Sequence, residues 1–437
     1  MKVFDLRSGI EWTDGNWNKL LVRPVYEGSS LETSVASILK DVKERGDQAV
    51  RHYSGQFDNV SLEKFEVSSR EMEEAEELVP AELKAAIQQA SANIGLFHKK
   101  QVEKVRVIET MPGVQCWRKM LAIQKVGLYI PGGTAPLFST VLMLGIPARI
   151  AGCREMIMCS PPGKDGRLQP AILFAAKVSG ISRIFKVGGV QAIAALAYGT
   201  ESIPKVNKIF GPGNQYVTAA KKMVQMEGIA IDMPAGPSEL AVYADQSANP
   251  IFLAADLLSQ AEHGIDSQVM LVCCSDLLAG QVLLEIEQQA KNLARKKIAG
   301  EALENSKIFL VSGEEEAMKL LNEYAPEHLI LACENAEELA GRVENAGSVF
   351  LGYYSPESAG DYATGTNHTL PTNGYAKAFS GVSVDSFVKK ITFQKLSREG
   401  LHRIGKTVRL MAQAEGLGGH AHAVTVRLKD YSPSLED

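Results

Sequence analysis

The sequence is poor in cysteine and in long apolar runs, and both absences argue against whole classes of protein. It has 6 cysteines among 437 residues, and no two of them form a Cys-x-x-Cys pair. This usage disfavours a disulfide-stapled secreted fold and a thiolate metal site. No apolar run approaches the roughly 20 residues of a membrane-spanning helix, and the first residues lack the apolar stretch of an export signal. We therefore expect a cytoplasmic protein.

The sequence also lacks an excess of charge of either sign. Lys and Arg number 46 and Asp and Glu number 51, which gives a net charge of −5, and neither sign forms a long block. A protein that binds nucleic acid or an anionic membrane surface usually carries a basic patch. We therefore expect no nucleic-acid partner and no membrane partner. What the chain does have is 45% hydrophobic residues, enough for the cores of several domains.

Two sets of short apolar segments follow one another from about Leu121, and each segment precedes a helix-like stretch. The first set of predicted strands is Val126–Ile130, Glu155–Cys159, Arg183–Val187, Lys208–Phe210 and Ala230–Asp232. The second set is Glu239–Tyr243, Gln268–Cys274, Lys307–Val311, His328–Ala332 and Ser348–Leu351. Alternating strands and helices with comparable spacing predict an α/β fold with two similar doubly wound, incomplete Rossmann-like domains.

The chain ends around these two domains are predicted to be helical. We expect an N-terminal helical segment at 1–120, a first α/β domain at 121–236, a second at 237–381 and a helical tail at 382–437. No strand is expected after about Gly381. A tail this short cannot bury much surface by itself, so it should pack on another domain or on a partner subunit.

Three glycine-rich segments follow predicted strands of the first domain. They are Pro131–Thr134, Gly188–Gln191 and Gly211–Asn214. Glycine lets a backbone approach a phosphate or a flat ring, and a following helix N-terminus favours anions, although tight turns without a ligand need the same residues. Three such segments in one domain favour a nucleotide-like ligand. The side chains best placed to touch it are Tyr129, Gln191 and Asn214.

Metal-ligand side chains gather in the last two fifths of the chain. Gln260 and His263 are one helical turn apart, so they can face one ion, although a solvated helix end has the same pattern. The segment Tyr354–His368 reads as a long polar loop that could offer the Asp361 carboxylate to a metal. Nitrogen and oxygen ligands without sulfur fit Zn²⁺, with Mn²⁺ or another divalent ion as the competitor.

Three further histidines and one glutamate complete the set of candidate residues. His420 would be the fourth metal ligand, with His422 as a rival two residues away, and His368 could hold a polar substrate. Glu327 and His328 precede a predicted strand and could divide general acid and base work, although an isolated Glu-His pair usually has no function. A zinc hydrolase with Glu327 as its base, or a noncatalytic metal- or nucleotide-binding protein, is an alternative.

Taken together, these motifs resemble the histidinol dehydrogenase family over nearly the whole chain. The segments that carry the resemblance are Val126–Pro136, Phe210–Asn214, Asp232–Glu239, Ser259–Gly264, Ala325–Leu329 and Gly360–Pro371. The resemblance implies an NAD-dependent four-electron oxidation of L-histidinol to L-histidine through L-histidinal, the last steps of histidine biosynthesis. It also implies two NAD⁺ used in succession, one Zn²⁺ per subunit, and a homodimer whose C-terminal tail reaches the other subunit.

The resemblance further implies a role for individual residues. The implied zinc ligands are Gln260, His263, Asp361 and His420, and NAD is held by Tyr129, Gln191 and Asn214. The implied substrate contacts are Ser238, His328, His368 and Glu415, together with the zinc ligands. His328 removes the alcohol proton before each hydride transfer, and Glu327 activates the water that hydrates the aldehyde. The zinc is implied to anchor the imidazole and amino nitrogens of the substrate.

Overall fold

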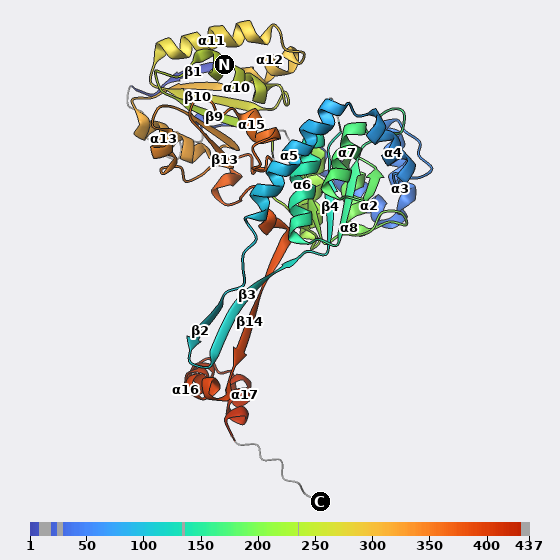
Figure 1. Ribbon diagram of the computed structural model, residues 1–437, viewed down its shortest axis with the longest axis vertical. Coiled ribbons are helices and arrows are strands. Elements are labelled where there is room, and N and C mark those ends of the chain that lie inside the picture. Colours follow the sequence, from blue (N-terminus) through green and yellow to red (C-terminus); the bar gives the residue numbers. More distant parts are fainter. Residues whose placement is uncertain (8–18, 24–28, 133–135, 235, 430–437) are drawn as a thin grey trace, which may run out of the picture. The chain divides into compact units, whose positions relative to one another are not determined.

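The structure, a computed structural model, describes residues 1–7, 19–23, 29–132, 136–234 and 236–429 (Figure 1). Gly133 and Thr134 of the first glycine-rich segment, and also Ala135 and Ala235, lie outside these ranges. The chain forms two units. The main unit comprises Met1–Gln101 and Ile123–Phe387, and the small unit comprises Val102–Ala122 and the chain from Val388 onward.

The first sheet of the main unit has five parallel strands in the order β6-β5-β4-β7-β8. They are β4 (Lys125–Tyr129), β5 (Glu155–Ser160), β6 (Arg183–Lys186), β7 (Lys208–Phe210) and β8 (Ala230–Ile231). The connecting helices are α6 (Phe138–Ala151), α7 (Pro170–Ser179), α8 (Gly189–Tyr198) and α9 (Gln215–Met226). In chain order the strands run 3-2-1-4-5, most of the doubly wound Rossmann arrangement.

The second sheet has six parallel strands in the order β1-β11-β10-β9-β12-β13. They are β1 (Lys2–Asp5), β9 (Glu239–Ala244), β10 (Gln268–Cys273), β11 (Lys307–Leu310), β12 (His328–Ala332) and β13 (Ser348–Leu351). Its helices are α10 (Pro250–Ala261), α11 (Asp276–Ala290), α12 (Lys296–Glu304), α13 (Glu314–Tyr324), α14 (Ala336–Ala340) and α15 (Glu357–Tyr362). Without β1 the strand order is again 3-2-1-4-5, which confirms the predicted pair of similar doubly wound halves.

Both faces of each sheet are covered, which explains why the strand interiors are apolar in succession, although most strands begin with a charged or polar residue. Along β4, Val126 and Leu128 pack into the core with α6 and α7, whereas Tyr129 belongs to the core on the opposite face with α8. Along β9, Leu240 packs with α10 and α11, and Ala241 packs with α13. Successive side chains of a strand point to opposite faces, so each strand serves two cores.

The N-terminal range is not wholly helical, and β1 corrects that prediction. Helices fill most of the described part before residue 100, in the order α2 (Ser29–Arg45), α3 (Asp47–Tyr53), the π-helical turn η1 (Ser54–Asp58), α4 (Ser69–Leu78) and α5 (Ala81–Lys99). β1 pairs in parallel with β11 at the sheet edge, and three of its four residues are exposed. A strand this short and exposed shows no alternation of apolar and polar residues in the sequence. It is identified only by its pairing at the sheet edge.

The small unit contains an antiparallel sheet in the order β14-β3-β2, followed by two helices (Figure 1). Its elements are β2 (Val107–Met111), β3 (Val114–Ala122), β14 (Val388–Leu396), α16 (Arg398–Ala414) and α17 (Gly418–Leu428). The prediction that strands end near Gly381 is therefore wrong. The apolar residues of β14 include pairs three positions apart, Val388 with Ile391 and Phe393 with Leu396, a spacing that also suits a helix. Continuous pairing with β3 over nine residues makes this segment a strand and not a helix.

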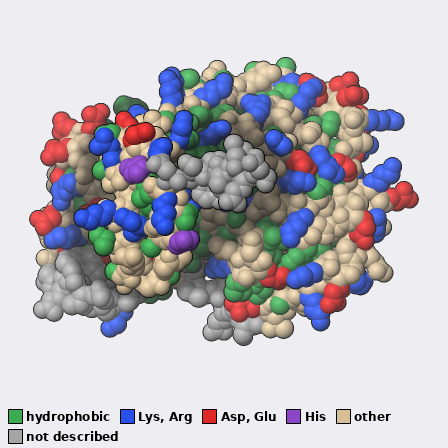
Figure 2. All heavy atoms as spheres, turned by 90° about the horizontal axis from the view of Figure 1, so that it is seen from below, with side chains coloured by type: hydrophobic (Ala, Val, Ile, Leu, Met, Phe, Trp, Pro, Cys, Tyr) green, Lys and Arg blue, Asp and Glu red, His purple; other side chains and the backbone are tan. Residues whose placement is uncertain are grey.

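The predicted ranges 1–120, 121–236, 237–381 and 382–437 remain a prediction about domains. Two short 3-10 turns, η2 (Tyr375–Lys377) and η3 (Val384–Phe387), complete the described elements of the main unit. No helix within the described ranges is long and apolar enough to cross a bilayer. On the face shown in Figure 2, basic and acidic side chains are both present among apolar ones.

Candidate active site

A cavity of about 1520 Å³ lies at the carboxyl edge of the first sheet, and all three predicted nucleotide contacts line it. Tyr129 ends β4, and its hydroxyl accepts a hydrogen bond from the Gly189 amide at 3.1 Å. Gln191 lies in the first turn of α8, and its side-chain oxygen is buried without a hydrogen-bond partner. Such an oxygen is available to a donor group of a ligand.

Asn214 is the N-cap of α9 and borders two cavities at once. Its amide oxygen accepts from the Val217 backbone at 3.1 Å, so a ligand would meet its amide nitrogen. The second cavity, of about 710 Å³, is lined by Gly211–Asn214 and by Ser238, His263, Glu327 and His368. Gly211 must be glycine, because a Cβ there would lie 2.0 Å from the Tyr129 carbonyl oxygen. The two sheets thus meet at adjoining cavities.

Glu327 and His328 lie at the amino edge of the second sheet, where β12 begins, and both are buried. The backbone of Glu239, the first residue of β9, holds them both. Its N–H donates to Glu327 Oε2 at 2.9 Å, and its carbonyl accepts from His328 Nδ1 at 3.2 Å. Since a carbonyl only accepts, His328 Nδ1 carries a proton. His328 Nε2 is buried and has no hydrogen-bond partner.

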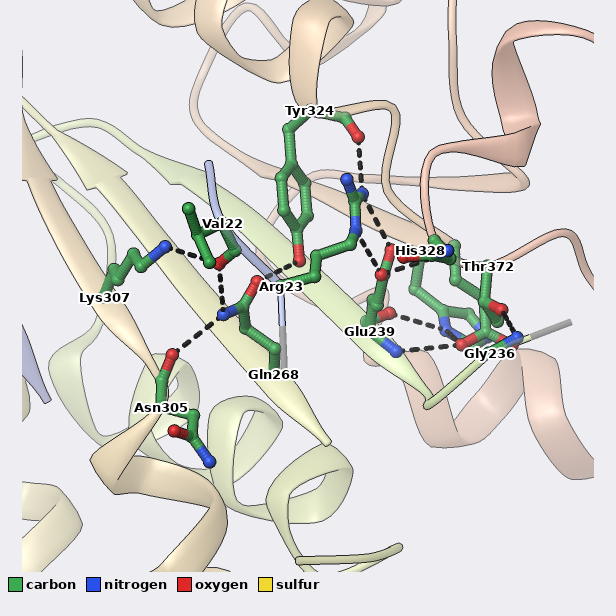
Figure 3. Close-up of polar contacts among 12 residues, drawn as sticks. Val22, Arg23, Gly236, Glu239, Gln268, Asn305, Lys307, Tyr324, His328 and Thr372 are labelled. Atoms are coloured by element: carbon green, nitrogen blue, oxygen red, sulfur yellow. Dashed lines mark hydrogen bonds and ion pairs between the residues drawn. The ribbon is translucent and has the colours of Figure 1, made fainter. Parts of the chain in front are cut away.

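The side chain of Glu239 is held as firmly as its backbone (Figure 3). Arg23 Nε lies 2.5 Å from Glu239 Oε1, and the Asn373 backbone donates to the same oxygen at 3.0 Å. Arg23 also donates to the Tyr324 carbonyl at 2.6 Å, and its guanidinium lies 4.0 Å from the centre of the Tyr324 ring. A buried carboxylate with a matched cation fixes the start of β9, and with it Glu327 and His328.

The predicted metal ligands of the main unit lie beside this pair. Gln260 is fully buried in the last turn of α10, and His263 follows the helix end, is exposed and lines the smaller cavity. Asp361 is buried in α15, with Oδ1 3.6 Å from His328 Nε2. His328, Asp361 and Glu357 present ligand atoms within 4.8 Å of one another.

Two predicted substrate contacts border the same cavity. His368 Nδ1 donates to the Asp361 carbonyl at 3.0 Å, and its Nε2 lies 3.1 Å from Thr140 Oγ1. Ser238 directly precedes β9, and its carbonyl accepts from the Gln268 backbone at 3.1 Å. Both are half-buried, so their polar atoms are positioned at the cavity wall.

The ionisable groups of this cluster perturb one another. Burial raises the pKa of Glu327 to about 7. Burial also acts to lower the pKa of His328, but neighbouring carboxylates, chiefly those of Glu357 and Glu327, raise this pKa to about 10. Burial raises the pKa of Glu357 well above its usual value. Groups with displaced pKa values at a cavity are typical of acid–base chemistry.

The family model described as histidinol dehydrogenase matches residues 21–428 of this chain. The chain belongs to the histidinol dehydrogenase family. The histidinol dehydrogenase of Bacteroides fragilis is 60% identical over 414 residues, which cover 95% of this chain and 97% of that protein. That of Xanthomonas axonopodis pv. citri is 52% identical over 432 residues, covering 98% and 99%. The crystal structure of histidinol dehydrogenase from Elizabethkingia anophelis superposes with a TM-score of 0.94 at 52% identity and covers 98% of each chain.

Two residues assigned from the resemblance to histidinol dehydrogenases belong to the small unit. Glu415 is the C-cap of α16, and His420 lies in the first turn of α17. Both are exposed, as is the rival His422. Their roles as substrate contact and metal ligand stay predictions.

Glu357 is not among the residues predicted for the site of this histidinol dehydrogenase family member, and the prediction for the segment around it is wrong. The segment Tyr354–His368 was expected to be a loop, but it contains α15, and Glu357 is the first residue of that helix. A glutamate at a helix start is usually a solvated group that complements the helix dipole, so it attracts no attention. The spacing held the signal, because Glu357 and Asp361 are four residues apart and share a helix face.

Proposed function

We propose that this protein, an oxidoreductase, converts L-histidinol to L-histidine through L-histidinal with NAD⁺ as the acceptor, the last steps of histidine biosynthesis. One observation carries the proposal. A buried carboxyl and a buried imidazole, Glu327 and His328, are held by the backbone of one residue, Glu239, beside a set of nitrogen and oxygen donors and a cavity. Two basic groups in one place suit two successive oxidations with a hydration between them.

The dinucleotide is assigned to the larger cavity. Tyr129, Gln191 and Asn214 would contact it, and α8 and α9 begin at this edge, where their N-termini favour the pyrophosphate. Asn214 borders both cavities, which supports a position of the cofactor's reactive end beside the substrate. Hydride transfer needs such contact between the two reactants.

The donor set fits a divalent cation of the zinc type. Gln260 offers an amide oxygen, His263 an imidazole and Asp361 a carboxylate, and the unpartnered His328 Nε2 marks a polar space beside them. When bound, one Zn²⁺ per subunit would anchor the imidazole and amino nitrogens of the substrate. We assign the fourth ligand to His420 of a C-terminal tail exchanged between the subunits of a cytoplasmic homodimer. Glu415 of the same tail, with Ser238 and His368, would contact the substrate.

The protein groups divide the proton transfers between them. His328 Nε2 takes the hydroxyl proton of histidinol while the carbon gives a hydride to NAD⁺, which yields histidinal and NADH. Glu327 takes a proton from water as the water oxygen adds to the aldehyde carbon, and the protonated His328 returns its proton to the carbonyl oxygen. The product is a hydrated aldehyde, and His328 is again a base. His328 then takes a hydroxyl proton of this hydrate while a second hydride leaves to a second NAD⁺. The product is the carboxylate of histidine.

The decisive experiment mixes the purified protein with histidinol and NAD⁺ and follows NADH. The expected result is two NADH per histidinol, loss of activity after chelation, and recovery when Zn²⁺ is restored. One NADH per histidinol would rule out the second oxidation. Hydrolysis of amides or esters without NADH would instead indicate a zinc hydrolase.

A further inference from the structure

Glu357 contacts both the candidate base His328 and the candidate metal ligand Gln260. None of the sequence motifs identified it as a candidate. It is 1% exposed and begins α15. One of its oxygens, Oε1, lies 3.5 Å from His328 Nδ1. The end of the Gln260 amide contacts the same carboxyl group, and with its nitrogen assigned to this end it donates to Glu357, in contact with Oε1 and 3.2 Å from Oε2. One carboxyl group therefore joins a candidate metal ligand to the candidate base.

This contact determines which way the Gln260 amide points. The ionised form of Glu357 only accepts hydrogen bonds, so with this form the amide nitrogen faces Glu357 and the amide oxygen faces away from it. The two ends of an amide differ little in shape, so packing alone would permit both orientations. Only the orientation that directs the oxygen away from Glu357 leaves it free to ligate a cation.

The same carboxyl group acts on His328. Its Oε1 and the Glu239 carbonyl both lie on the Nδ1 side of the ring, at 3.5 and 3.2 Å. In the neutral form of the ring, two acceptors on one side keep the proton on Nδ1 and leave Nε2 as the basic atom. Groups behind a ligand or a base that fix its orientation commonly change metal affinity or activity by about 10- to 100-fold.

We propose that Glu357 is a positioning residue that orients the Gln260 oxygen toward the cation and holds the His328 ring for proton transfer. The proposal rests on the proposed function for its second half, but its first half concerns cation binding alone. Two other roles are possible for a buried carboxyl group here. It could ligate the cation directly, or it could merely stabilise α15.

A double-mutant cycle on zinc affinity separates these roles. The measurement is competition with a chelator on the full-length protein, without substrate or NAD⁺. Glu357→Gln replaces an acceptor by an amide whose NH₂ can oppose that of Gln260, and we expect zinc to bind about 10- to 100-fold more weakly. In the Gln260→Ala background the same substitution should change affinity by less than about twofold. An equal loss in both backgrounds would overturn the proposal, because a direct ligand or a structural residue acts without Gln260.

A second double-mutant cycle tests whether Glu357 acts on the imidazole of His328. Single-turnover formation of NADH from histidinol, with zinc at saturation, should slow about 10-fold in Glu357→Gln and show no further loss in the His328→Asn background. An additive loss would show that Glu357 does not act through His328. Glu357→Asp keeps the charge but shortens the side chain, so it should fall between wild type and Glu357→Gln in both measurements. It also keeps the test open if Glu357→Gln fails to fold.

Asp256→Asn is the matched control. Asp256 is a partly buried carboxyl group on α10, one turn before Gln260, and its pKa is raised by burial as that of Glu357 is. We expect zinc affinity within about twofold of wild type, because loss of a carboxyl group that positions no ligand should not matter. A loss equal to that of Glu357→Gln would mean that nearby negative charge, rather than orientation of Gln260, governs affinity. If the wild type binds zinc but forms no NADH, the proposed function fails while the zinc cycle still tests the orientation of Gln260.

Discussion

The two sheets share one strand order, yet they present opposite edges to their cavities. The first sheet uses its carboxyl edge, where Tyr129 ends β4 and α8 and α9 begin. The second uses its amino edge, where Glu239 and His328 begin their strands and Gln260 lies in the last turn of α10. The usual rule that ligands bind beyond the carboxyl ends of parallel strands therefore holds for the first sheet and not for the second.

The difference follows from the direction of the helices. A helix that links parallel strands runs back across the sheet, so its N-terminus lies at the carboxyl edge and its C-terminus at the amino edge. Partial positive charge at N-termini favours the phosphates of a dinucleotide, and partial negative charge at C-termini favours a cation. The predicted nucleotide contacts are neutral, and Lys221 and Asp232 nearby pair at 2.5 Å. The amino edge of the second sheet instead collects carboxylates and imidazoles.

The largest effect is expected when the base is removed from the amino edge. His328→Asn removes the free Nε2, so both hydride transfers should slow by about 10³-fold, within the range for general-base catalysis. NADH formation from histidinol and from histidinal measures the two steps separately. Zinc content should remain near one per chain. Loss of zinc would indicate that His328 is a metal ligand. It would contradict the proposal that His328 acts as the base while other residues hold the zinc.

Glu327→Gln should slow the middle step of the proposed reaction, the hydration of histidinal. Loss of the water-activating carboxylate should slow histidinal oxidation by about 10²-fold, while histidinol oxidation changes by less than about tenfold. Separate single-turnover assays of the two substrates measure the ratio. An equal loss in both would contradict the division of work between Glu327 and His328.

The same residue predicts a pH dependence. Burial raises the pKa of Glu327 to about 7, and only its deprotonated form can accept a proton from water. The rate of histidinal oxidation should therefore fall about tenfold for each unit as pH drops well below 7. Glu327→Gln should lose this acid limb, which pH–rate profiles of the wild type and the variant would reveal.

A smaller effect is expected on the free energy of unfolding when the positive charge that pairs with Glu239 at the amino edge is removed. Arg23→Met leaves the Glu239 carboxylate buried and unpaired, and the free energy of unfolding should fall by about 3 kcal/mol. Arg7→Met is the matched control, because Arg7 pairs with Asp5 and Asp276 on the surface and its loss should lower the free energy of unfolding much less. Equal losses in urea unfolding would show that burial of the Glu239 pair does not matter.

The smallest effect is expected at the carboxyl edge of the first sheet. Gln191→Leu removes one unpaired amide oxygen from the larger cavity, so the NADH dissociation constant should rise about tenfold, or about 1.4 kcal/mol. Fluorescence titration measures binding, and zinc affinity should not change. Unaltered NADH binding would show that Gln191 does not contact the nucleotide.

The comparison also shows which parts of the fold were predictable. All ten predicted core strands form, and His328–Ala332 and Ser348–Leu351 match β12 and β13 residue for residue. Those strands consist mainly of apolar residues bounded by turn residues, so their pattern is strong. β1 and β14 are exposed strands with weak patterns, and both form through pairing with distant parts of the chain.

For the site, residue type and local spacing identified the candidate acid, base, nucleotide contacts and donors, because these are properties of short segments. Four decisions belonged to tertiary structure: the sheet edge that carries each site, the Nδ1 proton of His328, the orientation of Gln260 and the presence of Glu357. Each depends on contacts such as that between Glu239 and His328, which are 89 residues apart. Folding alone brings such atoms within hydrogen-bond distance, so apart from the four-residue spacing of Glu357 and Asp361 no local pattern in the chain could have specified them.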